Sequence, residues 1–165
     1  MNRHSSAASL ALAVLAVLGL AGPALAQQQV PFKGGLNGVV TVGKPTPQGL
    51  PALVNATGNA THLGQFTLAI PHLVTRANGP ANGGTAVGTY QFVAANGDRL
   101  TASFNGQAKP TSTPGVLAIV ETATITGGTG RFAGATGSFT CMRLYDMVAG
   151  KTTGSFAGTI SAPGP

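Results

Sequence analysis

The sequence holds very little charge and almost no cysteine. Of its 165 residues only three are acidic and nine are lysine or arginine, so the net charge is +6, and it has one cysteine, Cys141, and no tryptophan. A single thiol cannot close a disulfide within the chain, so packing and hydrogen bonds must hold the fold together. Three carboxylates and three histidines also leave little material for acid–base catalysis, which needs titratable groups in fixed positions.

The motifs of metal centres and nucleotide sites are missing as well. The histidines and Cys141 lack metal-ligand spacing, with no Cys-x-x-Cys or His-x-x-x-His pair. The Gly-Gly-Thr-Gly run at 127–130 lacks the Gly-Lys-Ser/Thr ending of a phosphate loop, and there is no Gly-x-Ser-x-Gly elbow. The basic residues are scattered singly and are not clustered with aromatics, unlike a nucleic-acid surface. We therefore expect no metal, no cofactor and no nucleic-acid partner.

The one long apolar run lies at the N-terminus. A short basic start precedes an almost pure Ala/Leu/Val stretch, Ala7–Ala21, and Ala24–Ala26 has the small-x-small pattern that signal peptidase cuts. The run is short for a membrane span, which takes roughly 20 residues. The sequence therefore predicts a cleaved signal peptide over 1–26 and a secreted or periplasmic chain with no membrane span. Residues 27–165 suit one domain.

The rest of the chain is divided by glycine, proline and asparagine into short runs rich in Val, Ile, Thr and Phe. This pattern is typical of a β-sandwich or a β-barrel. The alternation of polar and apolar residues indicates antiparallel strands with one wet and one dry face, and closure would remove exposed edges, which favours the barrel. The expected strands are Leu36–Val42, His62–Ile70 (with Pro71 ending it or placing it at an edge), Thr85–Ala94, Arg99–Gln107, Val116–Thr126, Ser138–Val148 and Thr152–Ser161, with an eighth if Leu50–Asn55 pairs.

The most distinctive segment is Ile125–Gly137, which reads Ile-Thr-Gly-Gly-Thr-Gly-Arg-Phe-Ala-Gly-Ala-Thr-Gly. Gly127 and Gly128 permit a positive φ at a turn, and Gly130 allows a bulge. Phe132 supplies a ring for the core. The two later glycines let the following strand bend, as the corners of a small closed barrel require.

This run resembles the Gly-Gly-Thr/Ser-Gly-x-Phe-x-Gly-Ala-x-Gly segment of the allene oxide cyclase and dirigent barrels. The Thr-His-Leu-Gly-x-Phe run at Thr61–Phe66 resembles a run near the start of bacterial secreted proteins with an allene-oxide-cyclase-like barrel. The likeness is specific over Val116–Arg143 and looser over 35–161. It implies an all-β fold, a single antiparallel β-barrel of about eight strands with a central cavity, and a trimer as in the plant members. The resemblance identifies no catalytic residues, because the polar site residues of these families cannot be matched to positions of this sequence by motif.

Two charged residues fall on apolar strand faces. Glu121, the chain's one glutamate, shares a face with Leu117, so an inward orientation would put a carboxylate in an apolar barrel, where it could act as an acid or base. The alternative is a glutamate at the surface or the barrel mouth, paired with a base. Arg143 shares a face with Phe139 and Tyr145. It is the natural partner of Glu121 if both point inward, since a buried charge must be paired; otherwise it faces solvent.

Two further residues are of types that can carry chemistry. His62 falls on the apolar face of its expected strand, where it is either a structural residue or a binding side chain. Cys141 could be a nucleophile only with a base and an electropositive setting, and packing as a small apolar side chain is the alternative. The predicted site residues are Glu121 as the catalytic candidate and Glu121, Arg143, His62 and Tyr145 as the ligand-binding candidates.

Three functions fit this sequence. The scarcity of acids and histidines favours an exported, non-enzymatic barrel that binds a small apolar ligand or acts as an extracellular interaction module. The next is a structural or matrix protein that works as a homo-oligomer. The third, implied by the resemblance, is an isomerase of the cyclase type that steers a reactive substrate in its cavity, with Glu121 as the polar handle.

Overall fold

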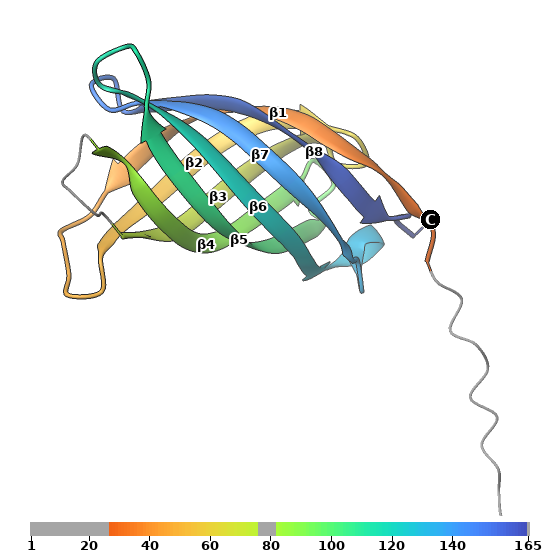
Figure 1. Ribbon diagram of the computed structural model, residues 1–165. Helices are drawn as coiled ribbons and strands as arrows, with labels where there is room; N and C mark the ends of the chain where they lie inside the picture. The colour runs from red at the N-terminus through yellow and green to blue at the C-terminus, as the bar shows by residue number, and fades with distance from the viewer. Residues whose placement is uncertain (1–26, 76–81, 165) are drawn as a thin grey trace, which may run out of the picture.

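Eight antiparallel strands close into one barrel in the computed structural model, which describes residues 27–75 and 82–164 (Figure 1). Each strand is hydrogen-bonded to the next in sequence, and β8 returns to β1. The strands are β1 (Gln29–Val42), β2 (Leu50–Ala60), β3 (Gly64–Thr75), β4 (Gly84–Ala94), β5 (Arg99–Pro110), β6 (Val116–Gly128), β7 (Gly137–Asp146) and β8 (Lys151–Ser161). The predicted signal peptide lies outside the described residues.

The prediction of an all-β closed barrel is confirmed, and the eighth strand is real because β2 pairs with β3 along its whole length. The expectation for Pro71 is wrong, since β3 continues to Thr75. Proline has no N–H to donate. The β3–β4 ladder accordingly skips Ile70 and Pro71 and resumes at His72, so the strand tolerates the proline as a local interruption.

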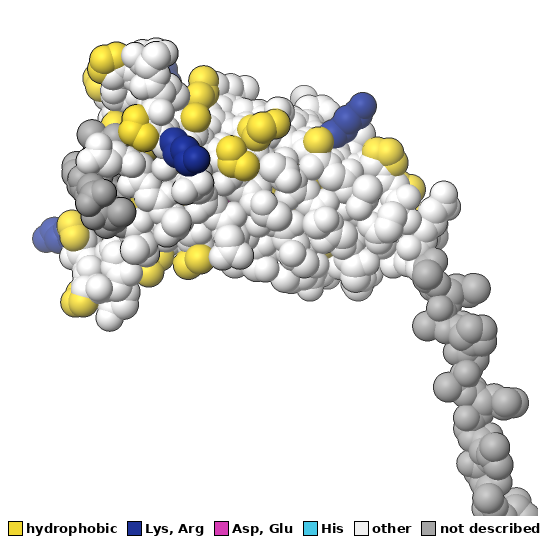
Figure 2. Space-filling model, in the orientation of Figure 1, with side chains coloured by type: hydrophobic (Ala, Val, Ile, Leu, Met, Phe, Trp, Pro, Cys, Tyr) yellow, Lys and Arg dark blue, Asp and Glu magenta, His cyan; other side chains and the backbone are white. Residues whose placement is uncertain are grey.

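Alternation along the strands separates an apolar interior from a polar outer wall. On β5 the side chains of Leu100, Ala102 and Phe104 are buried, whereas Ser103 and Asn105 are exposed, as the sequence predicts. The face seen in Figure 2 carries mostly uncharged side chains, with few lysines and arginines. Within the described residues, no helix is both long and apolar enough to cross a bilayer.

The glycine-rich segment turns the corner between β6 and β7. Gly127 has a φ of 130°, and Gly130, with a φ of 57°, opens a short 3-10 helix, η2 (Gly130–Phe132). Phe132 is fully buried, as expected. The bulge predicted at Gly130 lies elsewhere: the register of the β5–β6 pair shifts between Thr101 and Ala102.

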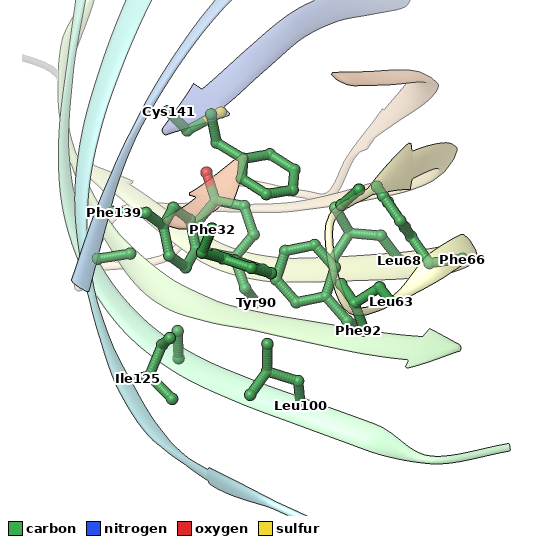
Figure 3. Packing of buried hydrophobic residues seen from close by; sticks show 14 of the residues in the cluster. Phe32, Leu63, Phe66, Leu68, Tyr90, Phe92, Leu100, Ile125, Phe139 and Cys141 are labelled. Atoms are coloured by element: carbon green, nitrogen blue, oxygen red, sulfur yellow. The ribbon is translucent and has the colours of Figure 1, made fainter. Parts of the chain in front are cut away.

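Aromatic rings fill the half of the barrel that lies toward η2 (Figure 3). The ring of Phe92 lies at the centre of this aromatic cluster. Its centroid is 5.2 to 6.2 Å from those of five neighbours, and most of the pairs are edge-on or tilted, the arrangement that aromatic rings prefer. The neighbours are Phe32, Phe66, Tyr90, Phe139 and Phe156. This half of the interior is packed with side chains, so the central cavity implied by the resemblance does not run through the whole barrel.

Replacement of Phe92 should therefore be among the most destabilising changes in the chain. We expect Phe92→Ala to lower the free energy of unfolding by about 3–5 kcal/mol, because it leaves a cavity among five rings. The outer-wall control Val87→Ala, at a side chain that is 54% exposed, should cost less than about 1 kcal/mol. Chemical denaturation of both variants measures the difference, and equal losses would contradict this view of the core.

Candidate functional site

The other half of the barrel holds a pocket that opens at the end carrying the 43–49 loop and the β7–β8 turn (left in Figure 1). Its volume is about 60 Å³. The walls are mainly aliphatic and come from seven of the strands and the segment after β7. The apolar lining residues are Val40, Val42, Leu50, Ala52, Val74, Ala86, Ala108, Leu117, Ile119 and Met147. The polar side chains are few: His72, Gln107, Glu121, Arg143 and Tyr145.

Glu121 and Arg143 form a buried ion pair that lines this pocket. Arg143 Nη2 donates to Glu121 Oε1 at 2.7 Å, and Arg143 Nε donates to Oε2 at 3.1 Å. The two side chains are 3% and 1% exposed. Two parallel hydrogen bonds between a guanidinium and a carboxylate are the strongest geometry available to such a pair. Of the orientations that the sequence leaves open, both residues adopt the inward one, and they are paired with each other.

Two hydroxyl groups add further hydrogen bonds to the pair. The Tyr90 hydroxyl donates to Glu121 Oε2. On the other side, Arg143 Nη1 donates to Thr152 Oγ1 at 3.3 Å, and Thr152 in turn donates to the Leu144 carbonyl at 2.7 Å. Each charged group therefore has a hydroxyl partner from another strand, Tyr90 on β4 and Thr152 on β8, in addition to its counter-charge, and such partners make a buried charge tolerable.

Glycines on the flanking strands make the room for these side chains. Gly106 on β5 lies opposite Glu121, and a Cβ there would come within 2.8 Å of Glu121 Cγ. Gly154 on β8 lies opposite Arg143, where a Cβ would come within 2.4 Å of Arg143 Cβ. Contacts this short do not occur between carbon atoms. Each of the two long charged side chains can face inward because the residue opposite it on the next strand is a glycine, which has no side chain.

Burial and the ion pair set the protonation states around the site. Burial raises the pKa of the Cys141 thiol to about 11, so the thiol is protonated at neutral pH and packs as a small side chain. Burial, together with the charge of Glu121, also raises the pKa of Tyr90 above its usual range. For Arg143, burial lowers the pKa, but the hydrogen bonds and charge of Glu121 more than offset it, so the guanidinium stays charged.

His72 is a site residue that the sequence did not reveal. Its Nδ1–H donates to the Ile70 carbonyl at 2.9 Å, so in the neutral ring Nε2 is left as an acceptor. Burial lowers the pKa of the imidazole, which favours that neutral form. His72 lies beyond the expected strand, His62–Ile70, whereas β3 continues through Pro71 and carries it to the pocket wall.

The expected position of His62 on the apolar face of a strand is wrong. The residue lies exposed in the turn between β2 and β3, with a φ of 65°, and its Nε2–H donates to the Pro31 carbonyl at 3.1 Å. β3 begins only at Gly64, which has a φ of 64°, so two left-handed residues break the alternation that was used to place His62 inside. This turn is at the η2 end of the barrel, away from the pocket. Tyr145, by contrast, does line the pocket.

Two solved structures share this architecture. One is the pterocarpan synthase dirigent protein PsPTS1, with a TM-score of 0.58 and 10% identity, where the match covers 84% of this chain and 97% of that one. The other is the pterocarpan synthase dirigent protein GePTS1, with a TM-score of 0.57 and 13% identity, covering 91% and 100%. The chain folds as a dirigent-like barrel.

The fold that the sequence resemblance implied is therefore confirmed. No protein-family model matches the chain, and no curated protein matches it. At 10% and 13% identity the dirigent-like barrel carries over the fold and not the activity, so the roles of individual residues must come from this site itself. In the part of the chain that the structure describes, no group of three or more His, Cys, Asp or Glu side chains could hold a metal ion.

The energetic link between Glu121 and Arg143 can be measured with a double-mutant cycle. Arg143→Met alone should lower the free energy of unfolding by about 3–5 kcal/mol, because it leaves a buried carboxylate without its counter-charge. Adding Glu121→Gln should recover a substantial part of that loss, with a coupling of about 2 kcal/mol or more.

A second ion pair on the same barrel provides the control. Arg131 Nε lies 3.0 Å from Asp98 Oδ2, but the Arg131 side chain is 37% exposed, so solvent screens this pair. The cycle made with Arg131→Met and Asp98→Asn should give a smaller coupling than the buried pair. A coupling that is equal at the two sites would contradict the account of a dry, mutually dependent pair.

Proposed function

We propose that the barrel binds a small, mainly aliphatic molecule in the pocket described above, and that Glu121 and Arg143 are the polar groups that contact this molecule. The observation that carries this proposal is the position of the pair. A charged pair with 1% and 3% exposure lines an open pocket whose other walls are apolar, whereas the opposite half of the barrel is packed with aromatic rings. Concave apolar sites with a few convergent polar groups are the usual form of small-molecule sites.

The hydrogen bonding of the pair leaves capacity for a ligand. A guanidinium has five N–H groups, and three of Arg143's are donated in the bonds to Glu121 and Thr152, which leaves two. A carboxylate has about four acceptor positions, and Glu121 uses three of them with Arg143 and Tyr90. A ligand oxygen could accept from Arg143, and a ligand hydroxyl or amide could donate to Glu121.

The dirigent-like fold supports a binding or steering role. The two similar structures are named as pterocarpan synthases, so this barrel type can serve a synthase. For the present chain, steering of a reactive substrate is the second candidate function, with Glu121 facing the substrate. The geometry supports binding better than proton transfer by Glu121, because its carboxylate already accepts three hydrogen bonds. Confinement alone could still guide a reaction.

Ligand titrations followed by NMR of the ¹⁵N-labelled protein would test the binding proposal. The probes are four six-carbon compounds: hexan-1-ol, hexan-2-one, hexanamide and hexanoate. At least one should shift the backbone amides of the pocket strands and leave those around the aromatic cluster unchanged. If none of the four perturbs the pocket amides, the proposal fails.

A pair of matched variants locates the binding. Ala86 lines the pocket, and Ala86→Leu should fill it and weaken the best probe on the order of tenfold. The control Ala157→Leu adds the same atoms on the outer wall of β8, where the alanine is exposed, and should leave the affinity unchanged. Equal effects of the two changes would place the binding somewhere other than this pocket.

A further inference from the structure

Resting on the proposed function, we infer that Glu121 determines the charge of the ligand. By neutralising Arg143 it makes the pocket select an uncharged molecule that carries an oxygen, such as an amide, a ketone or an alcohol. Without the carboxylate of Glu121, the same pocket becomes a site for carboxylates. Glu121 is on this account a specificity-determining residue for binding.

The first step is the charge of the pocket wall. Among the described side chains that line the pocket, the charged ones are Glu121 and Arg143, which cancel, and the remaining polar ones are Gln107, Tyr145 and His72. Burial lowers the pKa of the His72 imidazole, and this outweighs the opposite effect of its bond to the Ile70 carbonyl, so the neutral ring is favoured. Tyr90 and Cys141, which lie next to the pair, are protonated. The wall is therefore polar at the ion pair and has no net charge.

The second step is what this wall does to a charged ligand. A carboxylate brought to Arg143 would find the best face of the guanidinium, Nε together with Nη2, already occupied by Glu121. It would also lie close to the Glu121 carboxylate in a site with little water, where like charges repel strongly. A neutral oxygen avoids this repulsion and can still accept from the remaining N–H groups of Arg143. The pair thus accepts a hydrogen-bonding ligand and opposes an anionic one.

The third step is the effect of removing the carboxylate. Glutamine has the shape of glutamate, and its carbonyl oxygen can still accept from the Tyr90 hydroxyl. Arg143, however, becomes a buried cation whose bidentate face no longer meets a charge. A ligand carboxylate can supply that charge by accepting from the two N–H groups of Arg143 that residue 121 and Thr152 leave free. Anion binding should then relieve the cost of the unpaired arginine.

Hexanamide and hexanoate give the sharpest test, because they have nearly the same shape and differ in charge. Their affinities for the full mature chain would be measured at pH 7.5 by NMR titration of the pocket amides. We expect the wild-type protein to bind hexanamide at least about tenfold more tightly than hexanoate, and Glu121→Gln to reverse that order by a similar factor.

Two controls isolate the charge of Glu121 itself. Asp146→Asn removes a carboxylate at the same end of the barrel, where Asp146 accepts from the backbone N–H groups of Val148 and Ala149, and should leave the wild-type preference intact. The double variant Glu121→Gln/Arg143→Gln has no buried charge at this point. It should keep binding hexanamide and lose the gain in hexanoate affinity.

The opposite substitution, Arg143→Gln, tests the inference if Glu121→Gln does not fold. Arg143→Gln leaves Glu121 as the unpaired buried charge, so the pocket should then prefer hexylammonium to hexanamide. The preference of the wild-type protein for hexanamide can be measured without any variant. Equal binding of hexanamide and hexanoate by the wild type, or tighter binding of hexanoate, would overturn this inference and leave the proposed function standing. If neither hexanamide nor hexanoate reaches the pocket, the inference fails, and the proposed function fails with it when hexan-1-ol and hexan-2-one do not bind there either.

Discussion

The bidentate hydrogen bonds between Arg143 and Glu121 hold two opposite charges inside a barrel that is otherwise lined by apolar side chains. Well-packed apolar residues of similar volume often stabilise a fold as much as a buried ion pair does, or more. In the aromatic half of this barrel the interior is filled by such well-packed apolar residues, with no ion pair among those that the structure describes. The pair is therefore better explained by what it offers to the pocket than by its contribution to stability.

Much of the local structure follows from accommodating that pair. Gly106 and Gly154 leave space for the two side chains, and Thr152 accepts from the guanidinium. Tyr90 connects the two halves of the interior, since its ring stacks with Phe92 at a centroid distance of 5.7 Å while its hydroxyl donates to Glu121. The aromatic cluster stabilises the barrel independently of the pocket. The pocket end can therefore contain charged groups and open space without loss of the fold.

The sequence predicted the parts of this structure that depend on period-two alternation. Counting along their strands put Glu121, Arg143 and Tyr145 on the same faces as apolar residues, but it left open whether Glu121 and Arg143 point inward. The same counting failed at His62, because the left-handed backbone at that turn resets the alternation.

Tyr90 and Thr152 could not be assigned to the pair from sequence. Their roles depend on which strands lie side by side and in what register, which no single strand reveals. Gly106 and Gly154 were the available signal, since an interior glycine in a strand often marks the close approach of a neighbour. The resemblance of the glycine-rich segment predicted the fold. Because this segment forms the corner between β6 and β7, away from the pocket, it carried no information about the site.

The most direct test of a dry, bidentate Glu121–Arg143 pair is NMR of the arginine side-chain N–H groups in the ¹⁵N-labelled protein, with the Arg143 signals identified by their loss in Arg143→Lys. The account predicts separate Nη signals that exchange slowly with water, because the guanidinium is fixed by its partners and shielded from solvent. A single averaged Nη signal in fast exchange, like that expected of the exposed Arg99, would contradict it.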